Sequence, residues 1–261
     1  MQKLVDPLSM TATVRSEEVP PYRAAFTETP RFALVRKTLI VCGILSSLLY
    51  VAANVVVPMQ FDGYSLVSQT VSELSAIDAP TRQFWLMMMV PYGSFLVAFG
   101  LGVWWTASGS RALRATGVLF ITHGVIGYFW PPMHQRGAPL TVTDTMHIVF
   151  TLIVVPIMML QIAFGAAALG KQFRIYSVVT FAAVIFFGIL TGFDGPRIAA
   201  DLPTPWVGVW ERICIASYML WVIVFAVALL RRENNQPGTN QDEDVQDYGV
   251  RPLRFFDSRL G

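Results

Sequence analysis

The chain has 261 residues, of which 54% are hydrophobic and only 14% are charged. A soluble domain usually carries about a quarter of charged residues, so this composition argues against an ordinary soluble protein. The net charge of +2 and the lack of a dense basic tract exclude nucleic acid as an expected partner.

Long apolar stretches recur along the chain, and each approaches the roughly 20 residues that cross a hydrocarbon core. They lie at 39–57, 84–105, 113–130, 145–169, 175–193 and 204–230. Thr204 and Pro205 are typical of the cap and the first residue of the sixth helix. The sequence therefore predicts an all-α, polytopic membrane protein, a bundle of about six transmembrane helices that occupies residues 38–230.

Two polar segments flank the predicted membrane domain. Residues 1–37 lack a basic region followed by a short apolar core, so they are not a secretory signal peptide, and we expect a disordered leader. Residues 231–261 carry an acidic cluster and no sustained apolar pattern, which predicts a disordered tail.

Lysine and arginine are distributed unequally between the two sides of the predicted membrane domain. One side, shared by both termini, holds nine such residues and the other holds four. The nine are Arg31, Arg36, Lys37, Arg111, Arg114, Lys171, Arg174, Arg231 and Arg232. Because basic flanks favour the cytoplasm, we expect a multi-pass plasma-membrane protein with both termini in the cytoplasm. The sequence leaves the oligomeric state open.

The predicted outer segment, 59–82, combines a helical pattern with ionisable side chains. These side chains are Glu73, Asp78 and Arg82. Apolar residues recur at helical spacing between 67 and 74, and Thr70 with Glu73 matches a capping box, so a short amphipathic helix is expected. It is either a surface helix on the bilayer or a lid over the outer mouth of the bundle.

Polar residues within the predicted spans fall mostly in the outer half. His123 lies near the middle of the third span, where an ionisable group usually faces the bundle interior. Asp144 and His147 share one face at the start of the fourth span. Glu211 and Arg212 are adjacent, so their side chains diverge and each needs a partner elsewhere or access to water.

Each of these polar residues also has a purely structural explanation. Asp144 suits a helix cap, His123 suits a neutral hydrogen-bonded core position, and Arg212 could extend to the surface. The functional hypothesis is a polar cluster at the outer mouth, in which Arg212 pairs with Glu73 or Asp144. Its candidate ligand-binding residues are Glu73, Asp78, Arg82, His123, Asp144, His147, Glu211 and Arg212.

Glycines recur at matching intervals in the second and third spans. Gly93 and Gly100 are seven residues apart, as are Gly117 and Gly124. Small residues at such intervals let two helices approach closely, so these glycines indicate helix packing and no further function.

Several short motifs resemble those of one known family of bacterial and archaeal membrane proteins, domain of unknown function 998. The motifs are Ser72-Glu73-Leu74-Ser75 with Ala79-Pro80-Thr81, then Trp130-Pro131-Pro132 with Thr143-Asp144-Thr145-Met146-His147, and Gly208-Val209-Trp210-Glu211-Arg212-Ile213. The resemblance covers roughly 38–230 and implies a six-helix membrane domain. It carries no catalytic residue over to this chain.

Three functions remain open at this level. The first is binding or transport of a lipid or small amphiphilic molecule that enters from the outer face. The second is a structural or accessory membrane protein without a ligand, and the third is an intramembrane metal-dependent lipid hydrolase. Such a hydrolase would resemble the alkaline ceramidase type, whose last helix carries a His-x-x-x-His pair, and it is the least favoured because the sixth span here has no histidine. We therefore expect no metal and no cofactor, and we favour binding over catalysis.

Overall fold

The computed structural model describes residues 30–234, and this part of the chain is all-helical. Six long helices run α1 (Pro30–Val56), α2 (Arg82–Trp105), α3 (Arg111–Tyr128), α4 (Val142–Ala168), α5 (Lys171–Phe193) and α7 (Val207–Asn234). Three short helices complete it: η1 (Pro58–Gln60), η2 (Val71–Ser75) and α6 (Gly195–Ala199). The predicted all-α fold is confirmed.

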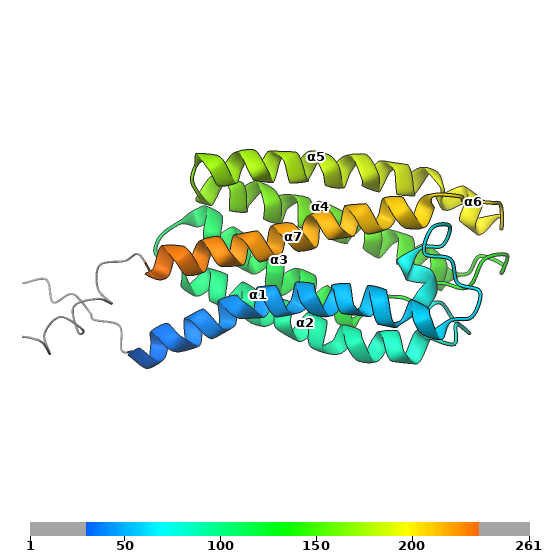
Figure 1. The fold of residues 1–261 in the computed structure, drawn as a ribbon, viewed down its shortest axis with the longest axis horizontal. Coiled ribbons are helices and arrows are strands. Elements are labelled where there is room, and N and C mark those ends of the chain that lie inside the picture. Colours follow the sequence, from blue (N-terminus) through cyan, green and yellow to red (C-terminus); the bar gives the residue numbers. More distant parts are fainter. Residues whose placement is uncertain (1–29, 235–261) are drawn as a thin grey trace, which may run out of the picture.

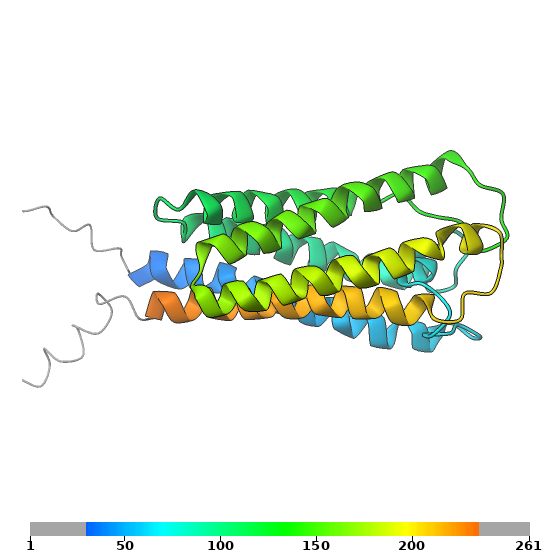
Figure 2. The same cartoon turned by 90° about the horizontal axis from the view of Figure 1, so that it is seen from above.

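The six long helices form a closed ring (Figures 1 and 2). Each long helix packs against the next along the chain, and α7 closes the ring by packing against both α5 and α1. Short connections at α2–α3 and α4–α5 make these neighbours antiparallel. The ring therefore encloses an interior to which every long helix contributes one face.

Five helices of the described chain, α1, α2, α4, α5 and α7, are long and apolar enough to cross a membrane. Helix α3 has 18 residues and carries Arg111, Arg114 and His123, which lower its hydropathy. It still packs between α2 and α4 as the sixth member of the ring. Each predicted span lies on one of these six helices.

The predicted start of the sixth helix is wrong. Helix α7 begins at Val207, after a turn at Pro205 and Trp206. The Thr204 hydroxyl donates to the Ser68 carbonyl at 2.9 Å instead of capping the helix.

Both ends of the described chain lie at the same end of the bundle, which we call the terminal end (Figure 1). There Arg36 Nε and Glu233 Oε1 form an ion pair of 2.5 Å, and the Thr106 hydroxyl donates to the same oxygen at 3.1 Å. Helix α1 begins at Pro30, so the predicted leader ends earlier than residue 37. The rest of the predicted leader and most of the tail, 235–261, fall outside the described residues.

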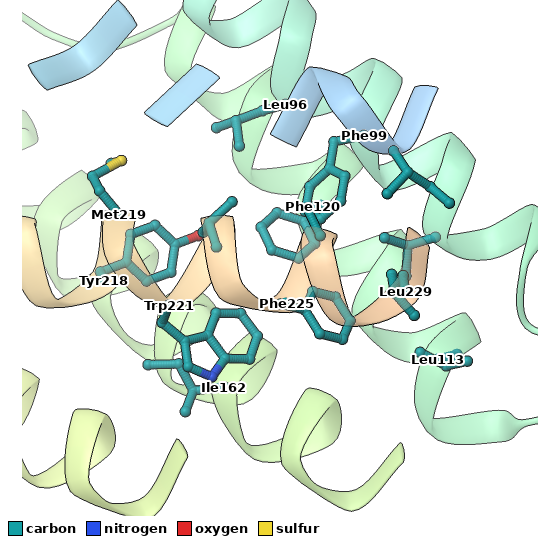
Figure 3. Packing of buried hydrophobic residues seen from close by; sticks show 14 of the residues in the cluster. Leu96, Phe99, Leu113, Phe120, Ile162, Tyr218, Met219, Trp221, Phe225 and Leu229 are labelled. Atoms are coloured by element: carbon teal, nitrogen blue, oxygen red, sulfur yellow. The ribbon is translucent and has the colours of Figure 1, made fainter. Parts of the chain in front are cut away.

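The interior of the terminal half is filled by aromatic rings from three helices (Figure 3). Phe99 of α2 contacts Phe120 of α3 with ring centroids 4.7 Å apart, and Trp221 stacks on Phe225 of α7 at 5.0 Å. All four side chains are fully buried. These rings therefore form the packed centre of this half of the ring.

Helices α2 and α3 approach each other through two pairs of glycines. A Cβ atom on Gly100 would lie 2.7 Å from the carbonyl oxygen of Gly117, and one on Gly124 would lie 2.8 Å from that of Gly93. The obstacles are backbone atoms, which have little freedom to move. The predicted close packing at these four glycines is confirmed.

Candidate functional site

The opposite end of the bundle, which we call the loop end, contains a cavity of about 370 Å³. It lies inside the ring, beyond the aromatic core. All six long helices line it, and η2 closes part of its top. Its most informative lining residues are Tyr50, Ser72, Ser75, Arg82, Trp85, Tyr92, His123, Val155, Gly192, Glu211, Ile215 and Tyr218.

Helices α2 and α7 each present one continuous face to the cavity. On α7 the lining residues Glu211, Cys214, Ile215 and Tyr218 are spaced three, four and seven apart, which is one side of an α-helix. On α2 the same spacing runs from Arg82 through residues 85, 86 and 89. The charged residue of each face, Arg82 or Glu211, is its first residue along the chain and lies at the loop end. The charged groups of these two faces therefore lie near the top of the cavity.

The top of the cavity is covered by residues 57–81, which we call the cap segment. Val71 and Leu74 of η2 are buried against the loop-end parts of α1 and α2, while Ser72 and Ser75 line the cavity. The predicted capping box of Thr70 and Glu73 is present. The element is a 3-10 helix folded into the mouth, so the lid prediction is confirmed and the surface helix on the bilayer is wrong.

Arg136 fastens the cap segment to two other loops. Its guanidinium holds both carboxylate oxygens of Glu73, at 2.5 and 3.0 Å, and donates to the Thr204 hydroxyl and the Ser68 carbonyl at 2.8 Å each. Burial alone would raise the pKa of the Glu73 carboxyl. Hydrogen bonds from Arg136 and Thr70 outweigh this, so the pKa lies below its ordinary value of 4.5.

Arg212 also fastens the cap segment, but through neutral groups. It donates to the carbonyls of Leu66 and Gln69 at 3.0 and 3.1 Å and to the Tyr64 hydroxyl at 2.7 Å. Burial raises the pKa of Tyr64 to about 12, so this hydroxyl stays neutral. The predicted pairing of Arg212 with Glu73 or Asp144 is therefore wrong, because carbonyl oxygens and a phenol occupy the two terminal nitrogens of the guanidinium, while its buried Nε has no partner among the described residues.

Gly208 allows this approach of the cap segment to α7. A Cβ atom there would lie 2.4 Å from the carbonyl oxygens of both Leu66 and Gln69. The Gly208 amide donates to the Val67 carbonyl at 3.0 Å. One helical turn later, Glu211 accepts the amide proton of Val71 at 2.5 Å.

Asp144 and His147 hold the 131–141 loop at the start of α4. Asp144 forms a capping box with Thr141 and accepts from the His134 amide at 2.6 Å, with the His134 ring 2.9 Å away. His147 Nδ1 lies 2.8 Å from the Pro131 carbonyl, and its Nε2 lies 3.2 Å from the Ser72 hydroxyl. Both residues therefore position the loop against the cap segment.

His123 lies at the floor of the cavity in a buried polar network. Its Nδ1 is 3.3 Å from the Tyr218 hydroxyl, which in turn donates to Gln161. These side chains come from α3, α7 and α4 and join the three helices at the boundary with the aromatic core. The hydrogen-bonded core position that the sequence allowed for His123 matches this geometry.

The candidate residues from the sequence thus separate into two groups. Arg82, His123 and Glu211 line the cavity. The others, Glu73, Asp144, His147 and Arg212, hold loops in place, while Asp78 is exposed in a left-handed turn (φ 67°).

Sequence reasoning missed Arg136, the partner of Glu73, and the cavity's aromatic residues Tyr50, Trp85 and Tyr92. The period of three and four residues from Arg82 through Trp85 could have indicated that Trp85 shares a face with a charged residue.

Four residues of the cavity lining are exposed on the surface of the chain: Leu86 of α2, Gly127 of α3, Val155 of α4 and Gly192 of α5. Helices α4 and α5 lie close together at the terminal end and diverge towards the loop end (Figure 2). Nothing lies within 4 Å of where a Cβ atom of Gly192 would stand.

No group of three or more metal-ligating side chains is found within residues 30–234. His134 and His147 hold loops, whereas His123 lies on the cavity floor, so the histidines do not gather around one point.

Comparison with known proteins agrees with the motifs. The profile of the protein family of unknown function 998 (DUF998) matches residues 44–228. The chain belongs to this family. The match covers all six long helices at least in part, together with the cap segment, Arg136 and the whole cavity lining. No curated protein and no solved structure matches the chain.

Proposed function

We propose that this DUF998 protein is a multi-pass protein of the plasma membrane that binds an amphiphilic molecule in its loop-end cavity. The observation that carries the proposal is the cavity itself. Its volume of about 370 Å³ falls in the range of small-molecule sites, about 300 to 1,000 Å³. Apolar residues dominate its lining, and a few charged or polar groups lie near its top, as in sites that orient a ligand.

The position of the cavity suits a ligand that comes from the bilayer. Five long apolar helices favour membrane insertion. The basic residues at the terminal end favour the cytoplasm for both termini, which places the loop end outside. The exposed lining residues of α4 and α5, Val155 and Gly192, then face the lipid tails, and the proposed route for an amphiphile runs sideways between these two helices.

The packed aromatic core distinguishes binding from passage across the membrane. Phe99, Phe120 and Phe225 close the interior directly below the cavity. A molecule that enters at the loop end therefore stops at His123 and Tyr218 in this conformation. The accessory-protein alternative does not account for the cavity, and the described residues offer no clustered donor set for the hydrolase.

The proposal is tested by filling the cavity. Protein purified in mild detergent should retain a lipid or other amphiphile, detected by native mass spectrometry. Ile215→Trp places an indole inside the cavity and should reduce this retention at least about tenfold, which corresponds to about 1.4 kcal/mol. Leu220→Trp is the matched control, because Leu220 lies on the same helix and is 54% exposed. Equal retention by both variants would refute binding in the cavity.

A further inference from the structure

One wall of the cavity consists of three aromatic rings from two neighbouring helices. Tyr50 of α1 lies 5.7 Å from Trp85 and 5.0 Å from Tyr92 of α2, measured between ring centroids. The planes of Tyr50 and Trp85 are nearly perpendicular, at 83°, and those of Tyr50 and Tyr92 meet at 56°. All three residues line the cavity. Rings that meet at such angles do not lie flat on one another, so more than one ring can border the same space.

A carboxylate stands beside this aromatic wall. Glu211 lines the same cavity from α7, the other ring neighbour of α1. One of its oxygens accepts the Val71 amide at 2.5 Å, which fixes the side chain. No cationic side chain within residues 30–234 lies within ion-pair distance of it, because the adjacent Arg212 is committed to carbonyls and to Tyr64.

We infer that the amphiphile carries an ammonium group, which the cavity binds between the Glu211 carboxylate and the rings of Tyr50, Trp85 and Tyr92. Cations, and quaternary ammonium groups in particular, are attracted to the faces of aromatic rings arranged in this way. The ligand also supplies the opposite charge that a carboxylate held away from bulk water requires. This inference rests on the proposed function and specifies the chemical class of its ligand.

Arg82 extends the inference to the anionic part of such a headgroup. One of its nitrogens donates to the Ser75 carbonyl at 2.7 Å, and no carboxylate in the described chain pairs with it. Arg82 lies one turn before Trp85 on the cavity face of α2, closer to the mouth. A zwitterionic lipid headgroup could place its phosphate at Arg82 and its ammonium at the aromatic wall, whereas a simple alkylammonium would use the wall alone.

The experiment uses probes that share one dodecyl chain and differ in headgroup. The full-length protein in lipid nanodiscs is titrated with dodecyltrimethylammonium, dodecylphosphocholine, dodecanoate and dodecylglycerol, and binding is followed by calorimetry. Both ammonium probes should bind about tenfold more tightly than the neutral dodecylglycerol. If dodecylphosphocholine binds more tightly than dodecyltrimethylammonium, the ammonium group belongs to a lipid headgroup. If the two bind equally, it belongs to a simple alkylammonium. Either result supports the inference.

Substitutions at Glu211 and Tyr92 show whether these residues cause the preference for ammonium probes. Glu211→Gln keeps an oxygen to accept the Val71 amide, so the fold persists while the preference for ammonium probes is lost. Tyr92→Phe keeps the ring and should keep the preference, whereas Tyr92→Leu should weaken ammonium binding about threefold. The inference is overturned if dodecylglycerol or dodecanoate binds the native protein as tightly as the ammonium probes, or if Glu211→Gln leaves their affinities unchanged. Failure of every probe to bind would instead count against the proposed function.

Discussion

The two halves of the bundle use aromatic residues differently. In the terminal half, Phe99, Phe120, Trp221 and Phe225 pack against one another, both edge to face and stacked, and all four are fully buried. In the loop half, Tyr50, Trp85 and Tyr92 contact one another and line a cavity. The same six helices thus supply a rigid base and a hollow top.

The two halves also differ in how they are held together. The terminal half depends on direct helix contacts, including that of Gly100 on α2 with Gly117 on α3. The loop half depends on hydrogen bonds between loops, above all those of Arg136 and Arg212 to the cap segment. Because hydrogen bonds between loops hold this end together, the helices here need not pack closely against one another. The fold therefore tolerates a cavity at the loop end.

The first prediction compares truncations on one helix. Phe225→Ala removes a fully buried ring and should lower the free energy of unfolding by about 3 kcal/mol, because a packed interior leaves an empty space behind. Ile215→Ala should cost less than Phe225→Ala, since this side chain is only partly buried and borders the cavity on one side. Unfolding by dodecyl sulfate from a mild detergent measures both. Equal costs would mean that the loop half is as closely packed as the terminal half.

The second prediction concerns the contact of α2 with α3. Gly100→Val would force side-chain atoms against the Gly117 carbonyl and should destabilise the protein by about 2 kcal/mol. Gly127→Val is the control on α3, because nothing lies within 4 Å of its Cβ position. The same unfolding titration should find the control nearly unchanged. A tolerant Gly100 would contradict the close approach of these two helices.

Much of the fold follows from the sequence because apolar length and glycine spacing are local signals. The six spans and the glycine contacts came from such signals, and so did the capping box of Thr70 and Glu73. The start of α1 was misplaced because its first turns carry basic residues, which a membrane span rarely includes. Hydropathy reports burial in lipid and not where a helix begins.

The partners of the charged residues could not be predicted in the same way. The sequence indicated that Glu73 belongs to the segment at the mouth. It did not identify the ion-pair partner, Arg136, which lies 63 residues further along the chain in a loop with no regular pattern. Arg212 had several carboxylates within plausible reach, and in the structure its terminal nitrogens bind backbone carbonyls, which every residue of a sequence carries. Choosing among such partners requires the path of the loops, which depends on tertiary contacts.

The third prediction uses pH to loosen only the loop half. The folded-state pKa of Glu73 lies below its ordinary value of 4.5, so the stability this carboxylate contributes is complete above that value. It is lost as the pH falls below 4.5 and the carboxyl becomes protonated. The thermal midpoint should therefore drop in this acid range. Glu73→Gln should start from a lower midpoint and drop less, and an unchanged acid profile in that variant would show that other groups cause the loss.

The last prediction separates entry into the cavity from the stability of the fold. Gly192→Trp places an indole on the proposed route between α4 and α5, where a Cβ atom meets nothing within 4 Å. Its free energy of unfolding should therefore stay within about 0.5 kcal/mol of the native value. Exchange of a bound fluorescent amphiphile between the protein and lipid vesicles should nevertheless slow, because the substituted side chain blocks the route from the bilayer. Gly170→Trp is the control, since Gly170 is equally open but precedes α5 at the terminal end. If exchange slows equally in both variants, or in neither, the ligand does not pass between α4 and α5, and an entry under the cap segment, past Ser72 and Arg82, becomes the route to test.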